Sequence, residues 1–176
     1  MDNGSLSKQL GLKSLHNRLK FCIELAGTVE YLHTMGIVHG DIKADNILIS
    51  NSFEVQLADF GNATLVEYRT LLFTQTSPQF ACSPRFTAPE ILDDSIKKYT
   101  TKSDIYALGM KILHILTGQL PYADYSDTAA LAKVFRKIPP PRPRFDGILR
   151  SQRAKDTLWA MEVKQVLTET ERDSCT

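Results

Sequence analysis

The stretch "VHGDIKADNIL", residues 38–48, holds most of the polar chemistry of this chain in a short space. Four charged or amide residues lie within six positions, between apolar residues on both sides: Asp41, Lys43, Asp45 and Asn46. Taken alone, the stretch reads either as a polar turn, since Gly, Asp and Asn are ordinary turn residues, or as a catalytic loop. Gly40, between His39 and Asp41, raises the separate question of why no side chain stands there.

The segment before this stretch has apolar residues at three- and four-residue steps. They are Leu15, Leu19, Cys22, Ile23, Ala26, Val29 and Leu32. This spacing predicts an amphipathic helix. Ser14 is a suitable N-cap for it, and Gly36 is a suitable C-terminal stop.

The segment after the stretch alternates between apolar and polar residues. Ile47 and Ile49 precede a turn at residues 51–52, and Val55 and Leu57 follow it, which predicts a short β-hairpin. A hairpin brings its two ends together, so Asn46 and Asp59 should face one space. Their oxygens suit a hard cation such as Mg²⁺.

Two other residues of the stretch 38–48 could take part in a reaction next to such a cation. Asp41 could accept a proton from a hydroxyl group, because a carboxylate within reach of a hydroxyl can act as a general base. Lys43 could meet a phosphate oxygen.

The rest of the chain predicts more helix than strand. Residues 60–90 show no clear period and read as a long loop, which inside a compact domain is usually functional. Residues 102–117 are apolar nearly all round and predict a buried central helix that ends at Gly118. Further predictions are a helix over residues 128–137, an extended connector "PPPRPR" over 139–144, and a last helix over about 151–166.

Composition narrows the class of protein. The 176 residues suit one domain, and a net charge of +1 gives no reason to expect nucleic acid or an anionic membrane as a partner. The opening residues have no apolar core, and the most apolar segment is short and contains Lys111 and His114, so neither a signal peptide nor a membrane span is predicted. Three widely spaced cysteines indicate reduced thiols, and hence an intracellular, cytoplasmic protein.

Three motifs in this order resemble those of the protein kinase family. "HGDIKADN" resembles the catalytic loop H-R-D-x-x-x-x-N, "DFG" at 59–61 resembles the metal-binding motif, and "APE" at 88–90 resembles the end of the activation segment. The segment "SDIYALGMKILHILTGQLPY" is similar to the family's central helix, and "MDNGSL" to the end of its hinge. The resemblance runs from Met1 to about Ala160, and three motifs in order are far more specific than one.

The resemblance implies an α+β, mainly α fold: a protein-kinase-like C-terminal lobe with a small β-hairpin at the catalytic loop and a central buried helix. Residues 1–166 would be the kinase domain, incomplete and starting at the end of the hinge. Residues 167–176 would be a divergent, disordered tail.

The resemblance also assigns roles at the site. Asp41 would be the catalytic base and Lys43 would touch the transferred phosphate, while Asn46 and Asp59 would hold magnesium. The nucleotide would lie on Leu48, with Leu6 close by, next to the hinge-end positions Met1 and Ser5.

Further positions would support this site. Asp104 would hold the catalytic-loop backbone from beneath, Ser83 would bond to Asp41 and Lys43, and His39 and Phe60 would join an apolar column between the lobes. Gly61 completes the metal-binding motif, and Glu90 ends the activation segment. His114, on the buried helix, is read as a core residue with satisfied hydrogen bonds rather than as a ligand.

The function that the resemblance implies is transfer of the γ-phosphoryl group of ATP, with Mg²⁺, to Ser or Thr hydroxyls of a protein substrate. Departures from the family pattern leave two alternatives open, a non-catalytic kinase-like interaction module and a truncated, inactive product. Gly40 replaces an Arg that often reads an activation-loop phosphate, a role that Arg69 or Arg85 could take instead. No G-x-G-x-x-G stretch occurs in the chain.

The C-terminal part of the sequence also departs from the family pattern. It does not keep the family's Arg that pairs with Glu90, and Arg172 is a weak candidate to replace it. Both ends therefore look cut from a larger domain. The apolar face near His39, Leu48 and Phe60 would then be exposed, and we expect weak ATP binding and association with a partner or with a second copy.

Overall fold

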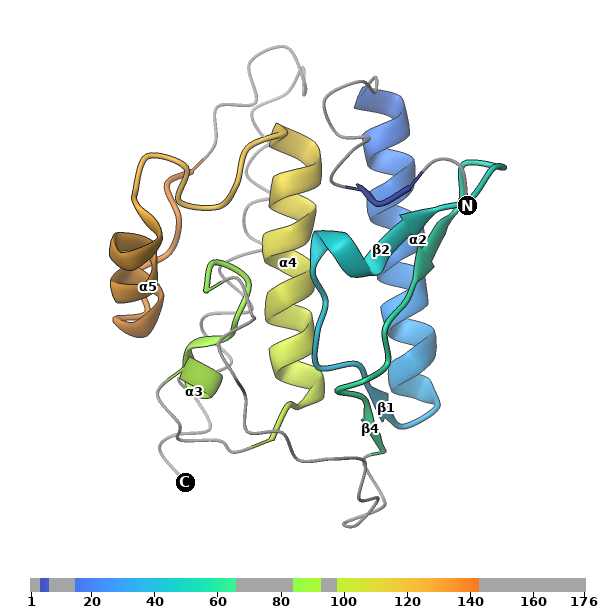
Figure 1. Ribbon diagram of the computed structural model, residues 1–176, viewed down its shortest axis with the longest axis horizontal. Helices are drawn as coiled ribbons and strands as arrows, with labels where there is room; N and C mark the ends of the chain where they lie inside the picture. The colour runs from blue at the N-terminus through green and yellow to red at the C-terminus, as the bar shows by residue number, and fades with distance from the viewer. Residues whose placement is uncertain (1–3, 7–14, 66–83, 93–97, 143–176) are drawn as a thin grey trace.

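The structure is a computed structural model that describes residues 4–6, 15–65, 84–92 and 98–142. Helices dominate it, and the strands are short and antiparallel. Helix α4, Thr101–Thr117, runs through the middle of the molecule, as Figure 1 shows. The mainly helical α+β class predicted from the sequence is therefore confirmed.

Helix α4 is defined at both ends by local chemistry. At its start, Thr100 and Ser103 form a capping box, in which each side chain accepts a hydrogen bond from the backbone N–H of the other residue. At its end, Gly118 adopts φ +72°, a left-handed conformation that glycine tolerates without strain. The predicted central helix and its stop at Gly118 are both present.

Two clusters of buried apolar side chains lie on different faces of α4. The first joins α4 to helix α2, Leu15–Thr34, and to the strand hairpin, and consists of Leu6, Phe21, Cys22, Leu25, Val29, Ile42, Ile47, Ile49, Ala107, Leu108, Ile115 and Leu116. The second joins α4 to residues 86–88 and to helix α5, Asp127–Phe135, and consists of Phe86, Ala88, Tyr106, Met110, Tyr122, Ala130 and Val134. Figure 1 shows α2 and α5 on opposite sides of α4.

Helix α2 is the amphipathic helix expected from the sequence, and Gly36 follows it with φ +69°. One part of the prediction is wrong, because Ile23 is 73% exposed. The buried face instead contains Phe21 and Leu25, which are almost fully buried. Successive helical residues are about 100° apart, so Ile23 lies well away from the line that joins Phe21, Leu25 and Val29.

The predicted hairpin consists of β2, Ile47–Ile49, and β3, Val55–Leu57. The strands pair antiparallel, with Ile47 opposite Leu57 and Ile49 opposite Val55. Part of the predicted loop over residues 60–90 is also regular. Strand β4, Thr64–Leu65, pairs with β1, Ile37–Val38, and a short helix α3 covers Pro89–Leu92.

The remaining predictions divide between described and undescribed parts of the chain. Helix α5 confirms the helix predicted over residues 128–137, within two residues at each end. The predicted last helix, the tail from 167 and most of the loop before Pro84 lie outside the described residues. No helix in the described ranges has the length and apolar character needed to span a membrane.

Candidate active site

The two strand pairs bring the opening stretch next to the residues that follow β3. Ala58 N–H donates to the carbonyl oxygen of Asn46 at 2.8 Å, one position beyond the hairpin ladder. The β1–β4 pair closes the other side, because it joins the residues just before His39 to those just after Gly61. Residues 39–46 and 58–61 therefore lie next to each other, and the expectation that Asn46 and Asp59 face one space stays a prediction.

His39 connects these two segments through its ring. Its Nδ1 accepts the backbone N–H of Asp41 at 3.2 Å, so the ring proton lies on Nε2, which donates to the carbonyl oxygen of Ala58 at 3.2 Å. Burial lowers the pKa of His39, although the nearby Asp104 carboxylate acts in the opposite direction. His39 is fully buried, so its predicted place on an exposed apolar face is wrong.

Asp41, Lys43 and Asn46 form a compact polar group. The ammonium of Lys43 lies 2.6 Å from Asp41 Oδ2, and the Asn46 amide nitrogen donates to the same oxygen at 3.0 Å and to the Asp41 carbonyl at 2.9 Å. The 3-10 turn η2, Ala44–Asn46, places the Asn46 side chain under the loop. Both contacts of the Asp41 carboxylate use Oδ2.

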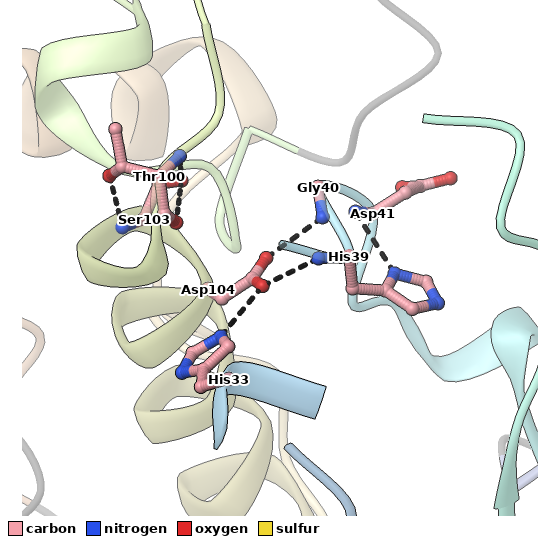
Figure 2. A network of polar contacts seen from close by, with 7 residues as sticks. All are labelled: His33, His39, Gly40, Asp41, Thr100, Ser103 and Asp104. Atoms are coloured by element: carbon pink, nitrogen blue, oxygen red, sulfur yellow. Dashed lines mark hydrogen bonds and ion pairs between the residues drawn. The ribbon is translucent and has the colours of Figure 1, made fainter. Parts of the chain in front are cut away.

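Asp104 holds this loop from beneath. Its Oδ2 accepts the backbone N–H of His39 at 2.7 Å and lies 3.0 Å from His33 Nε2, and its Oδ1 accepts the N–H of Gly40 at 2.9 Å. Figure 2 shows these three contacts converging on one carboxylate at the start of α4. Asp104 is 2% exposed, and hydrogen bonds to a buried charge are among the stronger ones in proteins. The contact that the resemblance implied for Asp104 is present.

Gly40 has a geometric reason to lack a side chain. Its φ is +75°, and a β-carbon placed on it would lie 2.9 Å from the carbonyl oxygen of Asn62 and 2.9 Å from Cδ2 of Tyr99. Real β-carbons do not make such short contacts. Any larger residue, Arg included, would therefore have to displace one or both neighbouring segments.

Asp59, Phe60 and Gly61 follow β3 and are exposed. Asp59 has φ +61°, a conformation that Asp adopts more readily than most residues, and its Oδ1 accepts the N–H of Gly61 at 3.2 Å. Phe60 is 48% exposed, and its ring packs at 4.9 Å from that of His39. The two rings are therefore in contact, and their place in an apolar column between lobes stays a prediction.

Leu48 and Ser5 come together on the hairpin. They form an antiparallel bridge, and Ile49 N–H donates to the carbonyl oxygen of Gly4 at 3.0 Å. Leu48 is half-buried, whereas Ile47 and Ile49 on either side point fully into the core. Leu6 is fully buried in the core and offers no surface to a ligand. Met1 lies outside the described residues.

The segment before α3 is anchored by Arg85. Its guanidinium donates to three backbone carbonyl oxygens, those of Pro121, Tyr122 and Tyr125, each at 2.7 Å, and to Asp127 at 2.8 Å. Arg85 is 5% exposed. The suggestion that it reads an activation-loop phosphate is therefore wrong, because its donors already join this segment to the turn before α5.

Four other residues named in the sequence analysis have different outcomes. Glu90 is buried at the start of α3. Ser83, Arg69 and Arg172 lie outside the described residues, and the pairing of Glu90 with Arg172 stays a prediction.

Sequence reasoning missed the role of Lys111. This side chain is fully buried on α4, and its ammonium lies 3.5 Å from the centroid of the Phe86 ring. Within the described residues, the Nζ atom has no hydrogen-bond partner. Burial lowers the pKa of Lys111 to about 7, against a smaller opposing effect of Asp45. The position of Lys111 within an apolar helical segment indicates that its side chain is buried. The sequence alone does not show which side chain it contacts.

His114, one turn further along α4, differs from its prediction. Its Nδ1 is buried with no hydrogen-bond partner among the described residues, so it is not the satisfied core residue expected. Burial, together with the positive charges of Lys111 and Arg18, lowers the pKa of His114 to about 4. Its ring lies 6.0 Å from that of Phe86.

A small pocket opens beside Asp41 and Lys43. Its walls include Ile42, Phe86, Ala88 and Tyr99. The pocket therefore combines apolar walls with the polar group of the loop, next to the segment that Arg85 anchors.

The donor chemistry of Asn46 and Asp59 fits a hard cation. The Asn46 amide nitrogen is used by Asp41, which leaves the amide oxygen as its ligand atom, and the Asp59 carboxylate is exposed. Across the described ranges, no group of three or more His, Cys, Asp or Glu side chains could hold a metal ion.

Comparison with known proteins gives a family. The model of the protein kinase domain matches residues 1–169. The chain is 37% identical over 123 residues to the LRR receptor-like serine/threonine-protein kinase GSO1 of Arabidopsis thaliana, covering 68% of this chain and 10% of that protein. It is 34% identical over 139 residues to the serine/threonine-protein kinase PknK of Mycobacterium bovis, covering 79% of this chain and 12% of that protein.

A third relative is the serine/threonine-protein kinase KIC1 of Saccharomyces cerevisiae, which is 38% identical over 117 residues, or 66% of this chain and 10% of that protein. The chain thus matches only about a tenth of the length of each of these three relatives. Since the family's model covers nearly every residue, this chain belongs to the protein kinase domain family.

Proposed function

We propose that residues 1–166 form the large, C-terminal lobe of a protein kinase that transfers the γ-phosphoryl group of ATP to Ser or Thr hydroxyls of proteins. Family membership supports the reaction class. The observation that carries the proposal is the polar group of Asp41, Lys43 and Asn46, on a loop held by Asp104 beside a small pocket.

Asp41 is the residue that orients the acceptor hydroxyl. Its Oδ2 is taken by Lys43 and Asn46, so Oδ1 is the oxygen available to accept the hydroxyl proton. Its backbone N–H is fixed by His39, and the adjacent Gly40 by Asp104. The carboxylate is thus held from several directions before substrate binds, as catalysis by positioning requires.

Lys43 supplies positive charge at the same place. Its ammonium contacts Asp41 in the structure, and its side chain remains partly exposed. In the reaction it would contact the transferred phosphoryl group, where negative charge has to be stabilised.

Asn46 and Asp59 would hold magnesium through the Asn46 amide oxygen and the Asp59 carboxylate. Two protein oxygens leave the other positions around this ion to water and phosphate, which is the usual arrangement for Mg²⁺. When bound, the ion neutralises charge on the phosphates.

The two substrates would approach from different sides. Adenine would lie against Leu48, near Ser5 and Met1. The acceptor protein would lie over the pocket beside Asp41, along the segment that Arg85 anchors.

The proposal is tested with Asp41→Asn in a complete active protein that contains this chain. We expect transfer to a Ser/Thr substrate to fall by about 10²–10⁴-fold, the usual contribution of a general base. Nucleotide affinity should change little, because Asp41 contacts the acceptor rather than ATP. Radiolabelled ATP measures transfer, and a fluorescent nucleotide measures binding.

Asp124→Asn is the matched control, because Asp124 is an exposed carboxylate in the turn before α5. It should transfer at the normal rate. Near-normal turnover of Asp41→Asn would contradict the assignment. A folded protein that transfers nothing in any variant would instead favour the non-catalytic kinase-like module.

A further inference from the structure

Lys111 is an unusual residue to find inside α4. Its side chain is fully buried, and its Nζ has no hydrogen-bond partner in the described ranges. An ammonium group without such partners is costly to bury, so its surroundings need an explanation. Three charged or titratable groups influence this region: Asp45 on the loop, His114 on the same helix, and Arg18 on α2.

The Phe86 ring is the group that Lys111 faces. The ammonium lies 3.5 Å from the ring centroid, where the negative face of the ring attracts a cation. Phe86 is 7% exposed, and the ring of His114 lies 6.0 Å from it. Lys111 therefore holds one face of Phe86 from within the core.

Phe86 in turn forms part of the pocket beside Asp41. Its backbone is fixed by the preceding residue, because Arg85 donates to three carbonyl oxygens before α5. The hydrogen bonds of Arg85 fix the backbone at this point but not the side chain of Phe86. The orientation of the ring therefore depends on the groups that pack against it. In this structure the ring packs in the second apolar cluster, and Lys111 supplies the charged contact on its face.

We infer that Lys111 is a positioning residue for the acceptor peptide: through its contact with the ring of Phe86 it holds this residue, which lines the pocket beside Asp41, and so sets the affinity of the site for the peptide. The inference rests on the proposed kinase function. It assigns Lys111 no contact with either substrate.

Lys111→Met separates this role from simple space filling, since methionine keeps an unbranched apolar side chain but removes the charge. In a complete active protein that contains this chain, assayed below about pH 7 where Lys111 is protonated, we expect the KM for a mixture of degenerate serine-centred peptides to rise by about 5- to 30-fold, the equivalent of a desolvated cation–π contact. The KM for ATP and kcat should stay close to normal. Lys102→Met, an exposed lysine on the same helix, is the control.

Phe86 variants test whether the effect passes through the ring. Phe86→Tyr keeps an aromatic face and should keep the peptide KM close to normal. Phe86→Leu should raise the KM, and adding Lys111→Met to it should raise the KM no further, because a pair in contact gives non-additive changes. Additive changes would overturn the inference.

A second measurement needs no catalysis. In the 176-residue chain with ¹³C-labelled phenylalanine, the NMR signals of the Phe86 ring should shift in Lys111→Met and stay unchanged in Lys102→Met. This readout also shows whether each variant is folded.

The outcomes are distinguishable. Absence of any transfer defeats the proposed function and this inference together. Transfer with an unchanged peptide KM in Lys111→Met overturns the inference alone, as does a raised KM without any change at the Phe86 ring.

Discussion

Gly40 shows how one missing side chain can organise a site. With φ +75° and neighbours at 2.9 Å on two sides, it is a position where only glycine avoids both strain and overlap. We expect Gly40→Ala to lower the free energy of unfolding by about 1–3 kcal/mol, from the left-handed conformation and the contacts together. Urea denaturation of the wild type and the variant measures this change in the free energy of unfolding.

Gly27→Ala is the matched control for that substitution. Gly27 lies inside α2, and a β-carbon there would meet nothing within 4 Å. Alanine should therefore stabilise the helix by about 0.5–1 kcal/mol. Equal losses at both positions would contradict the argument from Gly40.

A second expectation at this scale concerns phosphate on the activation segment. Position 40 carries no cation, and the donors of Arg85 are already used by the turn before α5. Phosphatase treatment of an active protein containing this chain should therefore change its transfer rate by less than about twofold. A large loss, restored by rephosphorylation at Thr76 or Ser77, would show that another cation reads the phosphate.

Individual residues differ in how far sequence could place them. The hairpin pattern predicts that the segment around Asn46 lies next to the segment that begins at Ala58, because a hairpin leaves little freedom in how its ends meet. The reason for Gly40 was not predictable, since Asn62 and Tyr99 reach it only through tertiary packing. The Lys111–Phe86 contact was hidden for the same reason.

Elements were more predictable than contacts. The lengths of α2, α4 and the hairpin follow from local periodicity and from glycine stops, which are properties of neighbouring residues. The buried face of α2 was placed wrongly at Ile23, because an apolar residue can occupy an exposed position without a large cost. Strands β1 and β4 are two residues each, too short to leave a periodic signal.

Helix α4 carries a prediction about pH. The pKa of Lys111 in the fold is about 7 and its ordinary value is 10.5, so between these values the unfolded chain binds more protons than the folded one. The free energy of unfolding should therefore rise with pH across this window and level off below about 7. Lys111→Met should remove roughly 2–3 kcal/mol of the rise between pH 7 and 9.

Denaturation curves recorded at several pH values would test this expectation. Lys102→Met serves as the control here as well, because it removes a lysine from the exposed face of the same helix. If the wild type and Lys111→Met change in parallel from pH 7 to 9, then Lys111 is charged throughout and its burial does not shift its titration.

At the scale of the whole molecule, Asp104 connects α4 with the end of α2 and with the loop at residues 39–46. Both oxygens accept hydrogen bonds from buried backbone N–H groups. Asp104→Asn replaces one acceptor with a donor, which leaves a buried N–H facing another N–H. We expect a loss of about 2–4 kcal/mol in the free energy of unfolding.

The exposed Asp124 gives the corresponding control for stability, because Asp124→Asn should change it by no more than about 0.5 kcal/mol. Thermal or urea denaturation of both variants makes the comparison. A change at Asp104 as small as that at Asp124 would mean that the loop finds other acceptors when the carboxylate is removed.

The two apolar clusters share α4, and this arrangement has a consequence for motion. Residues 86–88 and α5 could separate from α4 without disturbing the first cluster, whereas α4 cannot open without losing both. In hydrogen exchange, amides in the middle of α4 should therefore be the slowest, with α5 exchanging earlier as a separate cooperative unit. The face proposed to meet a protein substrate could then fluctuate on its own timescale while Asp104 and the loop at residues 39–46 stay fixed.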